Sequence, residues 1–265
     1  MRIGLRFALW LALAPALGLA LPSSVAQASE LWLITRDGEL HRLKDGAATT
    51  VARGLDKPQA MAALADGKVA VAHAGKLEIV GGKKRRTVPG RFADVVELAA
   101  PGARLCASTK AGELIEIDLA SGARKQLGAF SHLGHLTADG EALIVDHDGA
   151  FEVLGGQAAK LGKIAGHPIA IAAASGHLFY ATREGPLWQL DWQTGRSRDL
   201  GLGGWWGTLA LAVEGTNLFA VTESGKLWDI DFAAGTKRAL AMDGWQNAVA
   251  LALVRGAASP PANSR

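Results

Sequence analysis

The sequence predicts an all-β chain folded as a β-propeller, and three features of its repetition support this. Six short hairpins recur, positions at fixed offsets from their turns are apolar in every repeat, and the two chain ends hold complementary parts of one repeat. Self-similarity at a period of 20–50 residues is typical of propellers and solenoids. The hairpins turn at Gly38, Gly75, Gly112, Gly149, Gly185 and Gly225, which are 37, 37, 37, 36 and 40 residues apart.

Glycine suits these turns because a tight hairpin turn requires a positive φ, which glycine adopts without steric cost. Three columns flank the turn, two residues after it, five after it and six before it, and all their members are apolar. The columns are Leu40, Leu77, Leu114, Phe151, Leu187 and Leu227; Leu43, Val80, Ile117, Leu154, Leu190 and Ile230; and Trp32, Val69, Cys106, Leu143, Phe179 and Phe219. Cys106 is therefore expected to be a buried small apolar residue and not a nucleophile.

A strand rich in alanine and other small residues accompanies each hairpin, as expected for strands crowded around a central axis. These strands are predicted at 59–64, 94–99, 132–137, 168–173, 207–213 and 247–253. A weaker fourth strand follows most hairpins, at 85–88, 124–127, 196–200 and 237–241. Four antiparallel strands repeated radially form a propeller blade. We therefore predict a six-bladed β-propeller of four-stranded antiparallel blades.

The phase of the repeat predicts how the ring closes. The first hairpin has no inner strand before it, and the inner strand at 247–253 has no hairpin after it. We expect the N-terminal strands within 30–51 to pair with this C-terminal strand in one blade, which also covers two sheet edges. A parallel β-helix would instead need terminal caps. The propeller is assigned to residues 29–256, and 257–265 are expected to form a disordered tail.

Residues 1–28 have the features of a secretory signal peptide. A basic start with Arg2 and Arg6 precedes an apolar run from Phe7 to Leu21, and a small-x-small triplet ends at Ala28. Cleavage is expected after Ala28. The apolar run is short for a membrane span and no second span follows it, so no integral membrane segment is expected after cleavage. The predicted location is periplasmic or secreted.

Charge and cysteine content narrow the function classes. Removing residues 1–28 lowers the formal net charge from +3 to +1, so the sequence pI of about 9.1 does not indicate nucleic-acid binding. Cys106 is the single cysteine, which excludes an internal disulfide. The chain is expected to be a monomer stabilised by packing and ring closure.

Two local motifs resemble known propeller groups. The turn Ile117-Asp118-Leu119-Ala120-Ser121-Gly122, repeated from Leu190 and from Ile230, resembles the strand-Asp-x-x-x-Gly turns of quinoprotein-like and bacterial surface-protein propellers. Gly204-Trp205-Trp206 and Gly244-Trp245 resemble the entry to tectonin-type lectin repeats. These resemblances imply the architecture and no active-site residue. The aspartates are interpreted as caps of backbone turns rather than as a calcium or quinone site.

The candidate binding residues lie on one predicted face. In a propeller, the turn after the second strand and the link into the next inner strand emerge together around the channel mouth. The position two residues before each turn glycine is Arg36, His73, Lys110, His147, Arg183 or Glu223, and the links add Trp205, Trp206 and Trp245. Indoles stack on sugars and arginines match carboxylates. All of these except Glu223 are assigned to ligand binding, in a noncatalytic binding or scaffold module for an anionic envelope glycan or a protein partner.

The alternative function is a propeller hydrolase or lyase with a divalent metal at the channel mouth. His132, His135, His147 and His167 could converge with Asp146, and histidine and carboxylate suit zinc or copper. Their spacing is not diagnostic, and His135 is expected to face the channel or a neighbouring blade. The sequence contains no nucleophile elbow and no phosphate loop. No catalytic residue, metal ligand or cofactor is assigned.

Overall fold

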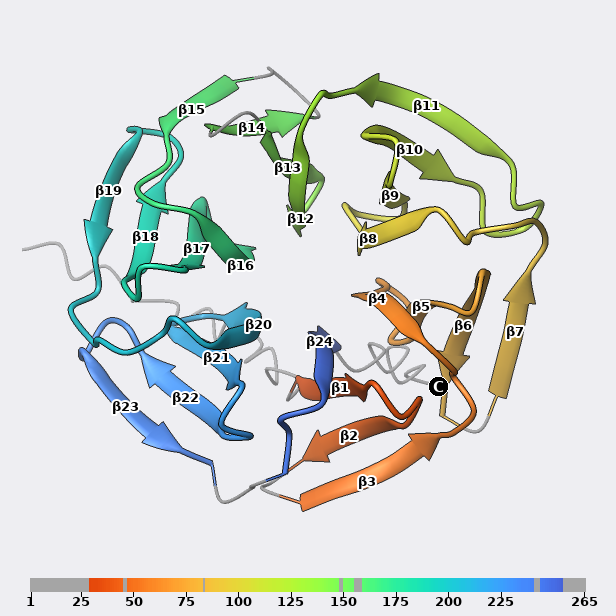
Figure 1. Cartoon of the computed structure of the whole chain (residues 1–265), viewed down its shortest axis with the longest axis horizontal. Coiled ribbons are helices and arrows are strands. Elements are labelled where there is room, and N and C mark those ends of the chain that lie inside the picture. Colours follow the sequence, from red (N-terminus) through yellow and green to blue (C-terminus); the bar gives the residue numbers. More distant parts are fainter. Residues whose placement is uncertain are drawn as a thin grey trace, which may run out of the picture.

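A computed structural model describes residues 29–44, 47–82, 84–147, 150–154, 159–240 and 244–254. These residues form 24 strands in six four-stranded sheets, arranged radially around a central channel (Figure 1). Neighbouring strands within each sheet are antiparallel. The prediction of an all-β propeller of four-stranded antiparallel blades is confirmed.

We number the sheets along the chain and give their strands from the channel outward. Sheet 1 contains β24 (Ala248–Val254), β1 (Glu30–Thr35), β2 (Leu40–Lys44) and β3 (Ala47–Ala52). Sheet 2 contains β4 (Pro58–Ala63), β5 (Val69–His73), β6 (Lys76–Gly81) and β7 (Lys84–Val88). Sheet 3 contains β8 (Val95–Ala99), β9 (Leu105–Thr109), β10 (Glu113–Ile117) and β11 (Arg124–Ala129).

The second half of the chain repeats this order. Sheet 4 contains β12 (Leu133–Asp139), β13 (Ala142–His147), β14 (Ala150–Leu154) and β15 (Ala159–Lys163). Sheet 5 contains β16 (Pro168–Ala174), β17 (His177–Thr182), β18 (Leu187–Asp191) and β19 (Arg196–Asp199). Sheet 6 contains β20 (Thr208–Glu214), β21 (Asn217–Thr222), β22 (Leu227–Asp231) and β23 (Thr236–Ala239).

Sheet 1 combines the two ends of the described chain. β24 pairs antiparallel with β1, with Glu30 opposite Val254 and Leu31 opposite Leu253. The inner strand of this sheet therefore comes from the C-terminal part, and its other three strands come from the N-terminal part. Through this pairing, the backbone groups on one edge of β1 form hydrogen bonds with β24. Without β24, this edge would have no partner strand.

The apolar columns flanking the hairpin glycines form the core between sheets. The column two residues after the glycine is fully buried, with exposures of 0–1% from Leu40 to Leu227. Cys106 is buried within the same layer, and burial raises its thiol pKa to about 11. The cysteine is therefore a packing residue, as predicted. Its thiol is expected to react poorly with alkylating reagents, because the thiolate is the reactive form.

A recurring contact joins neighbouring sheets at five junctions within the described residues. The residue that leads into the next inner strand donates its backbone N–H to the carbonyl of the preceding hairpin glycine, and we call these residues link anchors. The hydrogen bonds are Leu55 to Gly38 (3.1 Å), Phe92 to Gly75 (2.9 Å), Phe130 to Gly112 (2.8 Å), Trp205 to Gly185 (3.0 Å) and Trp245 to Gly225 (3.1 Å). The hairpin glycine thus adopts the positive φ of the turn and also accepts the hydrogen bond of the link anchor. At Gly38, φ is +77°, and a Cβ would lie 2.8 Å from the carbonyl carbon of Leu55.

Several predictions from the sequence fall on residues outside the described ranges. They are the signal peptide at 1–28, the turn at Gly149 and the tail at 257–265. Within the described ranges, no helix has the length and hydropathy of a membrane span.

Candidate functional site

The turns between second and third strands lie at the mouth of the channel. Together with the links they form one face, which we call the hairpin face. On this face, backbone N–H groups of the turn residues donate to the residues that precede the inner strands. These bonds are Arg36 to Asn247 (2.7 Å), Lys110 to Asp94 (2.8 Å), Arg183 to His167 (2.9 Å) and Glu223 to Gly207 (2.7 Å). The side chains of Arg36, Lys110 and Arg183 are exposed, so three of the predicted cations lie on the rim of the channel mouth.

The two histidines assigned to this rim are placed differently. His73 is 3% exposed, and its Nε2 lies 3.2 Å from the Glu78 Oε1, which makes it a core residue and corrects its assignment to the binding surface. Glu78 in turn accepts a hydrogen bond from the Arg85 Nε at 2.7 Å. His147 is half-buried, and its ring centroid lies 4.7 Å from that of Phe130, a link anchor.

Of the three tryptophans assigned to ligand binding, the structure leaves one exposed. Trp205 and Trp245 are link anchors, 2% and 8% exposed, so their assignment as ligand platforms is corrected. Trp205 packs edge-on against Trp228, with ring centroids 5.9 Å apart. Trp206 is 66% exposed, and a Cβ placed on Gly185 would lie 3.6 Å from its Cδ1. Its indole therefore sits over the hairpin that also carries Arg183.

A contact between a carboxylate and an imidazole ring lies on the same hairpin face. Glu184 accepts a hydrogen bond from the backbone N–H of His167 at 3.0 Å and lies 2.5 Å from the His167 Nδ1. These contacts, led by the backbone hydrogen bond, lower the pKa of Glu184 to about 2. The carboxylate is thus ionised and held against His167, next to the exposed guanidinium of Arg183.

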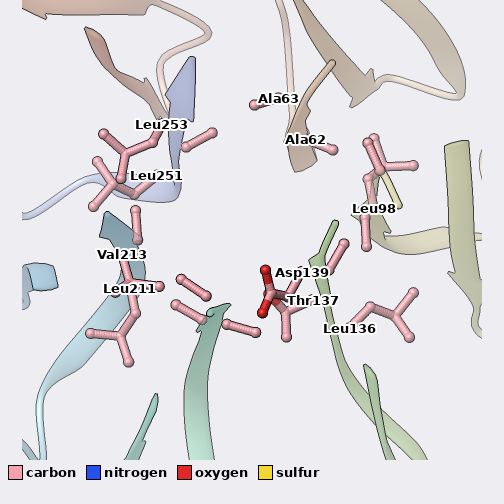
Figure 2. A pocket seen from close by; sticks show the side chains of 18 of the residues that line it. Ala62, Ala63, Leu98, Leu136, Thr137, Asp139, Leu211, Val213, Leu251 and Leu253 are labelled. Carbon is pink, nitrogen blue, oxygen red and sulfur yellow. The ribbon is translucent and has the colours of Figure 1, made fainter. Parts of the chain in front are cut away.

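Two of the cavities along the channel meet at a ring of apolar side chains, which we call the apolar waist. The cavity at the hairpin-face end has a volume of about 220 Å³, and the one at the opposite end about 430 Å³ (Figure 2). Six residues, one from each inner strand, line both cavities: Met61, Leu98, Leu136, Ile171, Leu211 and Leu251. In the larger cavity the acids are tied to the protein. Asp139 accepts a hydrogen bond from the Gly176 N–H at 2.8 Å, and Glu214 accepts one from the Ser29 hydroxyl.

On the hairpin-face side of this waist, the residues that line the channel differ between the sheets. The position before each waist residue is alanine in four inner strands, Glu97 in β8 and His135 in β12. The alanines are Ala60, Ala170, Ala210 and Ala250. The second strands show the same difference between apolar and polar positions. Ala72, Ala181, Val221 and Ile34 stand opposite the four alanines, whereas Ser108 stands opposite Glu97. In β13, Asp146 accepts a hydrogen bond from the backbone of His135.

We call Glu97, Ser108, His135 and Asp146 the polar cluster. The Nδ1 of His135 lies 2.7 Å from the Glu97 Oε1, and the backbone N–H of Leu136 donates to the Glu97 Oε2 at 2.6 Å. Glu97 therefore joins sheet 3 to sheet 4. Ser108 is 2% exposed, and its hydroxyl has no hydrogen-bond partner within the described ranges.

The pKa values show how strongly these groups interact. Burial disfavours the imidazolium of His135, but the hydrogen bond and charge of Glu97 outweigh it, so the pKa of His135 is raised. The pKa of Asp146 is also raised, first by burial and further by the charge of Glu97, against the lowering effect of His135. His135 and Asp146 consequently retain their protons to a higher pH than the same groups in water.

Of the predicted metal ligands, His135 and Asp146 lie in the polar cluster, whereas His147 and His167 make other contacts. His147 lies against Phe130 with its ring tilted, and His167 pairs with Glu184. In the part of the chain that is described, no group of three or more His, Cys, Asp or Glu side chains is arranged to hold a metal ion. The interpretation of the aspartate turns is confirmed. The Asp118 Oδ1 accepts hydrogen bonds from the backbone of Ala120 (3.0 Å) and Ser121 (2.7 Å), and Asp191 and Asp231 repeat this pattern.

Comparison with known proteins identifies the fold and not the family. No family model and no curated protein matches the chain. Among solved structures 1245 chains match, so the fold is too widespread to indicate one function. One match belongs to a nidogen/laminin complex (TM-score 0.72, 13% identity, 86% of this chain and 98% of that chain). Others are apo AztD from Citrobacter koseri (0.55, 13%, 88% and 100%) and a chain of the mitotic checkpoint complex (0.56, 14%, 84% and 80%). At identities this low, the structural similarity shows that the chain is a β-propeller and no more. Its structural neighbours include members of protein complexes.

Proposed function

We propose that this chain is a noncatalytic binding or scaffold module that holds a carboxylate-bearing partner on its hairpin face. The partner is an anionic envelope glycan or an acidic protein surface. The observation that carries the proposal is the position of Arg36, Lys110 and Arg183 around the channel mouth, with the exposed indole of Trp206 beside one of them. With export as predicted from residues 1–28, the partner would be periplasmic or extracellular.

The spacing of the rim cations favours an extended partner. Arg36, Lys110 and Arg183 belong to sheets 1, 3 and 5, so a polymer or a protein surface that covers the channel mouth could contact all three. Arginine presents a planar fork that pairs with carboxylates, and an exposed indole offers an apolar face to a sugar ring or a side chain. The occurrence of similar propellers in a nidogen/laminin complex and a mitotic checkpoint complex supports a large partner.

The test compares two triple variants of equal charge. Arg36, Lys110 and Arg183 are replaced by alanine in one, and Lys84, Lys125 and Arg196, exposed on the outer strands β7, β11 and β19, in the other. Binding is measured against immobilised carboxylate-bearing and neutral envelope polysaccharides, and against proteins cross-linked to the chain in its host. We expect at least about a tenfold loss of affinity for the rim variant only, because paired charges at an interface contribute more than about 1.4 kcal/mol together. Equal binding by the two variants would refute a cationic binding rim.

A further inference from the structure

The polar cluster is not required to pack the ring. At the same positions sheets 1, 2, 5 and 6 carry alanine, valine or isoleucine, and they close around the same channel. Burying charged and hydroxyl groups where alkyl groups suffice disfavours folding unless every group is fully hydrogen-bonded. The Ser108 hydroxyl, 2% exposed, meets no partner in the described structure. A buried unpaired group is unusual. Ser108 stands opposite Glu97, which does line the hairpin-face cavity, so this cavity is where a ligand would meet the polar cluster.

The groups around the cavity are mainly acceptors. Glu97, His135 and Gln59 line the hairpin-face cavity. The Gln59 Oε1 is buried and receives no hydrogen bond from any described residue. Behind this wall, Asp146 adds a second carboxyl group. The carboxyl and amide oxygens at this end of the cavity therefore favour a ligand that donates hydrogen bonds and carries a positive charge.

The opposite wall and the size of the cavity define the rest of the ligand. Ile169, Leu209 and Val249 line the side facing the acceptors. The volume of about 220 Å³ is below the range of roughly 300–1,000 Å³ typical of sites for drug-sized ligands. Below the cavity lies the apolar waist, which it shares with the larger cavity.

We propose that this cavity is a binding site for a small organic cation, a primary ammonium with a short apolar body. The ammonium group donates to Gln59 and Glu97, in the field of Asp146, and the alkyl part packs on Leu209 and Val249. This site is separate from the proposed rim contacts of Arg36, Lys110 and Arg183, and it stands or falls independently of them.

Three probes of equal length test the charge requirement: n-butylammonium, n-butanol and n-butyrate, titrated into the full chain and followed by calorimetry. We expect n-butylammonium to bind with one-to-one stoichiometry, and n-butanol and n-butyrate to bind at least about tenfold more weakly. Equal affinity for n-butylammonium and n-butanol would overturn the proposal. So would displacement of n-butylammonium by an equimolar divalent cation, because it would make the site a metal site.

Two variants connect the binding to the polar cluster. The double variant Glu97→Ala with His135→Ala installs the alanine pair already present in sheets 5 and 6. We expect it to lose affinity for n-butylammonium at least tenfold. Glu97→Gln, which keeps the side-chain size and removes its charge, provides the same binding test where the double variant fails to fold. Unchanged affinity in either folded variant overturns the site. Lys125→Ala, on the outer strand β11, is the control, and it should leave n-butylammonium binding unchanged.

Discussion

Sheets 5 and 6 differ from sheets 3 and 4 in how completely packing accounts for their residues. Sheets 5 and 6 are close copies, with Trp188 and Trp228 at equivalent positions on their third strands and alanine lining the channel. Sheets 3 and 4 have the same strand order and hairpins, but they hold Glu97 and His135 at the alanine positions. The repeats therefore act as internal controls. Sheets 5 and 6 show what the propeller needs, and sheets 3 and 4 show what it carries in addition.

The largest expected effect comes from a substitution that disrupts the packing between sheets 5 and 6. Trp205 is 2% exposed, lies against Trp228, and anchors the link between these sheets through the Gly185 carbonyl. Trp205→Ala would leave a cavity at the junction, and we expect it to lower the free energy of unfolding by about 3–5 kcal/mol. The measurement is urea unfolding followed by tryptophan fluorescence and circular dichroism.

The adjacent indole gives the matched control. Trp206 is 66% exposed, and Trp206→Ala should change the free energy of unfolding by less than about 0.5 kcal/mol. Similar losses for both variants would contradict the assignment of Trp205 as a link anchor and Trp206 as a surface residue.

A smaller effect sharpens the comparison at the hairpin glycines of sheets 3 and 6. Gly112 and Gly225 have nearly the same φ, +77° and +80°, so alanine costs each about 1–2 kcal/mol in backbone strain. At Gly112 the new Cβ would lie 2.1 Å from the carbonyl oxygen of Phe130, whereas at Gly225 it would first meet the flexible side chain of Gln246, at 2.7 Å. We expect Gly112→Ala to be the more destabilising by at least about 1 kcal/mol, measured by urea unfolding. Equal losses would show that backbone strain alone decides both positions.

The sequence predicted the hairpins and the core because both depend on short, fixed offsets from a glycine. It misplaced Trp205 and Trp245 because the link anchors do not share an offset. Their distance from the preceding hairpin glycine drifts from 17 residues at Leu55 to 20 at Trp245, and their type changes from leucine to phenylalanine to tryptophan. A drifting column of mixed type is difficult to align, so buried indoles were interpreted as exposed ones.

The polar cluster was predicted only in part. His135 was expected to face the channel or a neighbouring blade, and it does line the channel. Its pairing with Glu97 was not predicted, because an extra residue in each inner strand interrupts the pairing register, as between Val95 and Glu97. Such a β-bulge reverses the alternation of side chains beyond it. Aligning the six inner strands on their waist residues would have shown Glu97 and His135 as the exceptions to alanine.

The smallest expected effect is a pH dependence that differs in sign between the two regions. In sheet 4 the pKa of His135 is raised above the ordinary value of 6.5, so its interactions stabilise the fold fully below that pH, and the stabilisation is lost as the pH rises through the folded-state pKa. The raised pKa of Asp146 has the same sign at lower pH. In sheet 5 the lowered pKa values of Glu184 and Asp191 act oppositely, since their stabilisation is lost only as the pH falls into the acid range.

His135→Gln isolates the first of these contributions, because glutamine can still donate a hydrogen bond to Glu97 and does not titrate. We expect the difference in free energy of unfolding between the original chain and this variant to shrink from pH 5.5 to pH 8, by roughly 1 kcal/mol or less. A pKa change of 1 corresponds to about 1.4 kcal/mol. The His135 side chain is 26% exposed, and this exposure to solvent weakens its interaction with Glu97. His41 in sheet 1 supplies a control of opposite sign. Burial lowers its pKa, so the same difference in free energy of unfolding for His41→Gln should shrink as the pH falls and grow as the pH rises. A flat difference for His135→Gln across this range would mean that Glu97 holds the ring of His135 by geometry and not by charge.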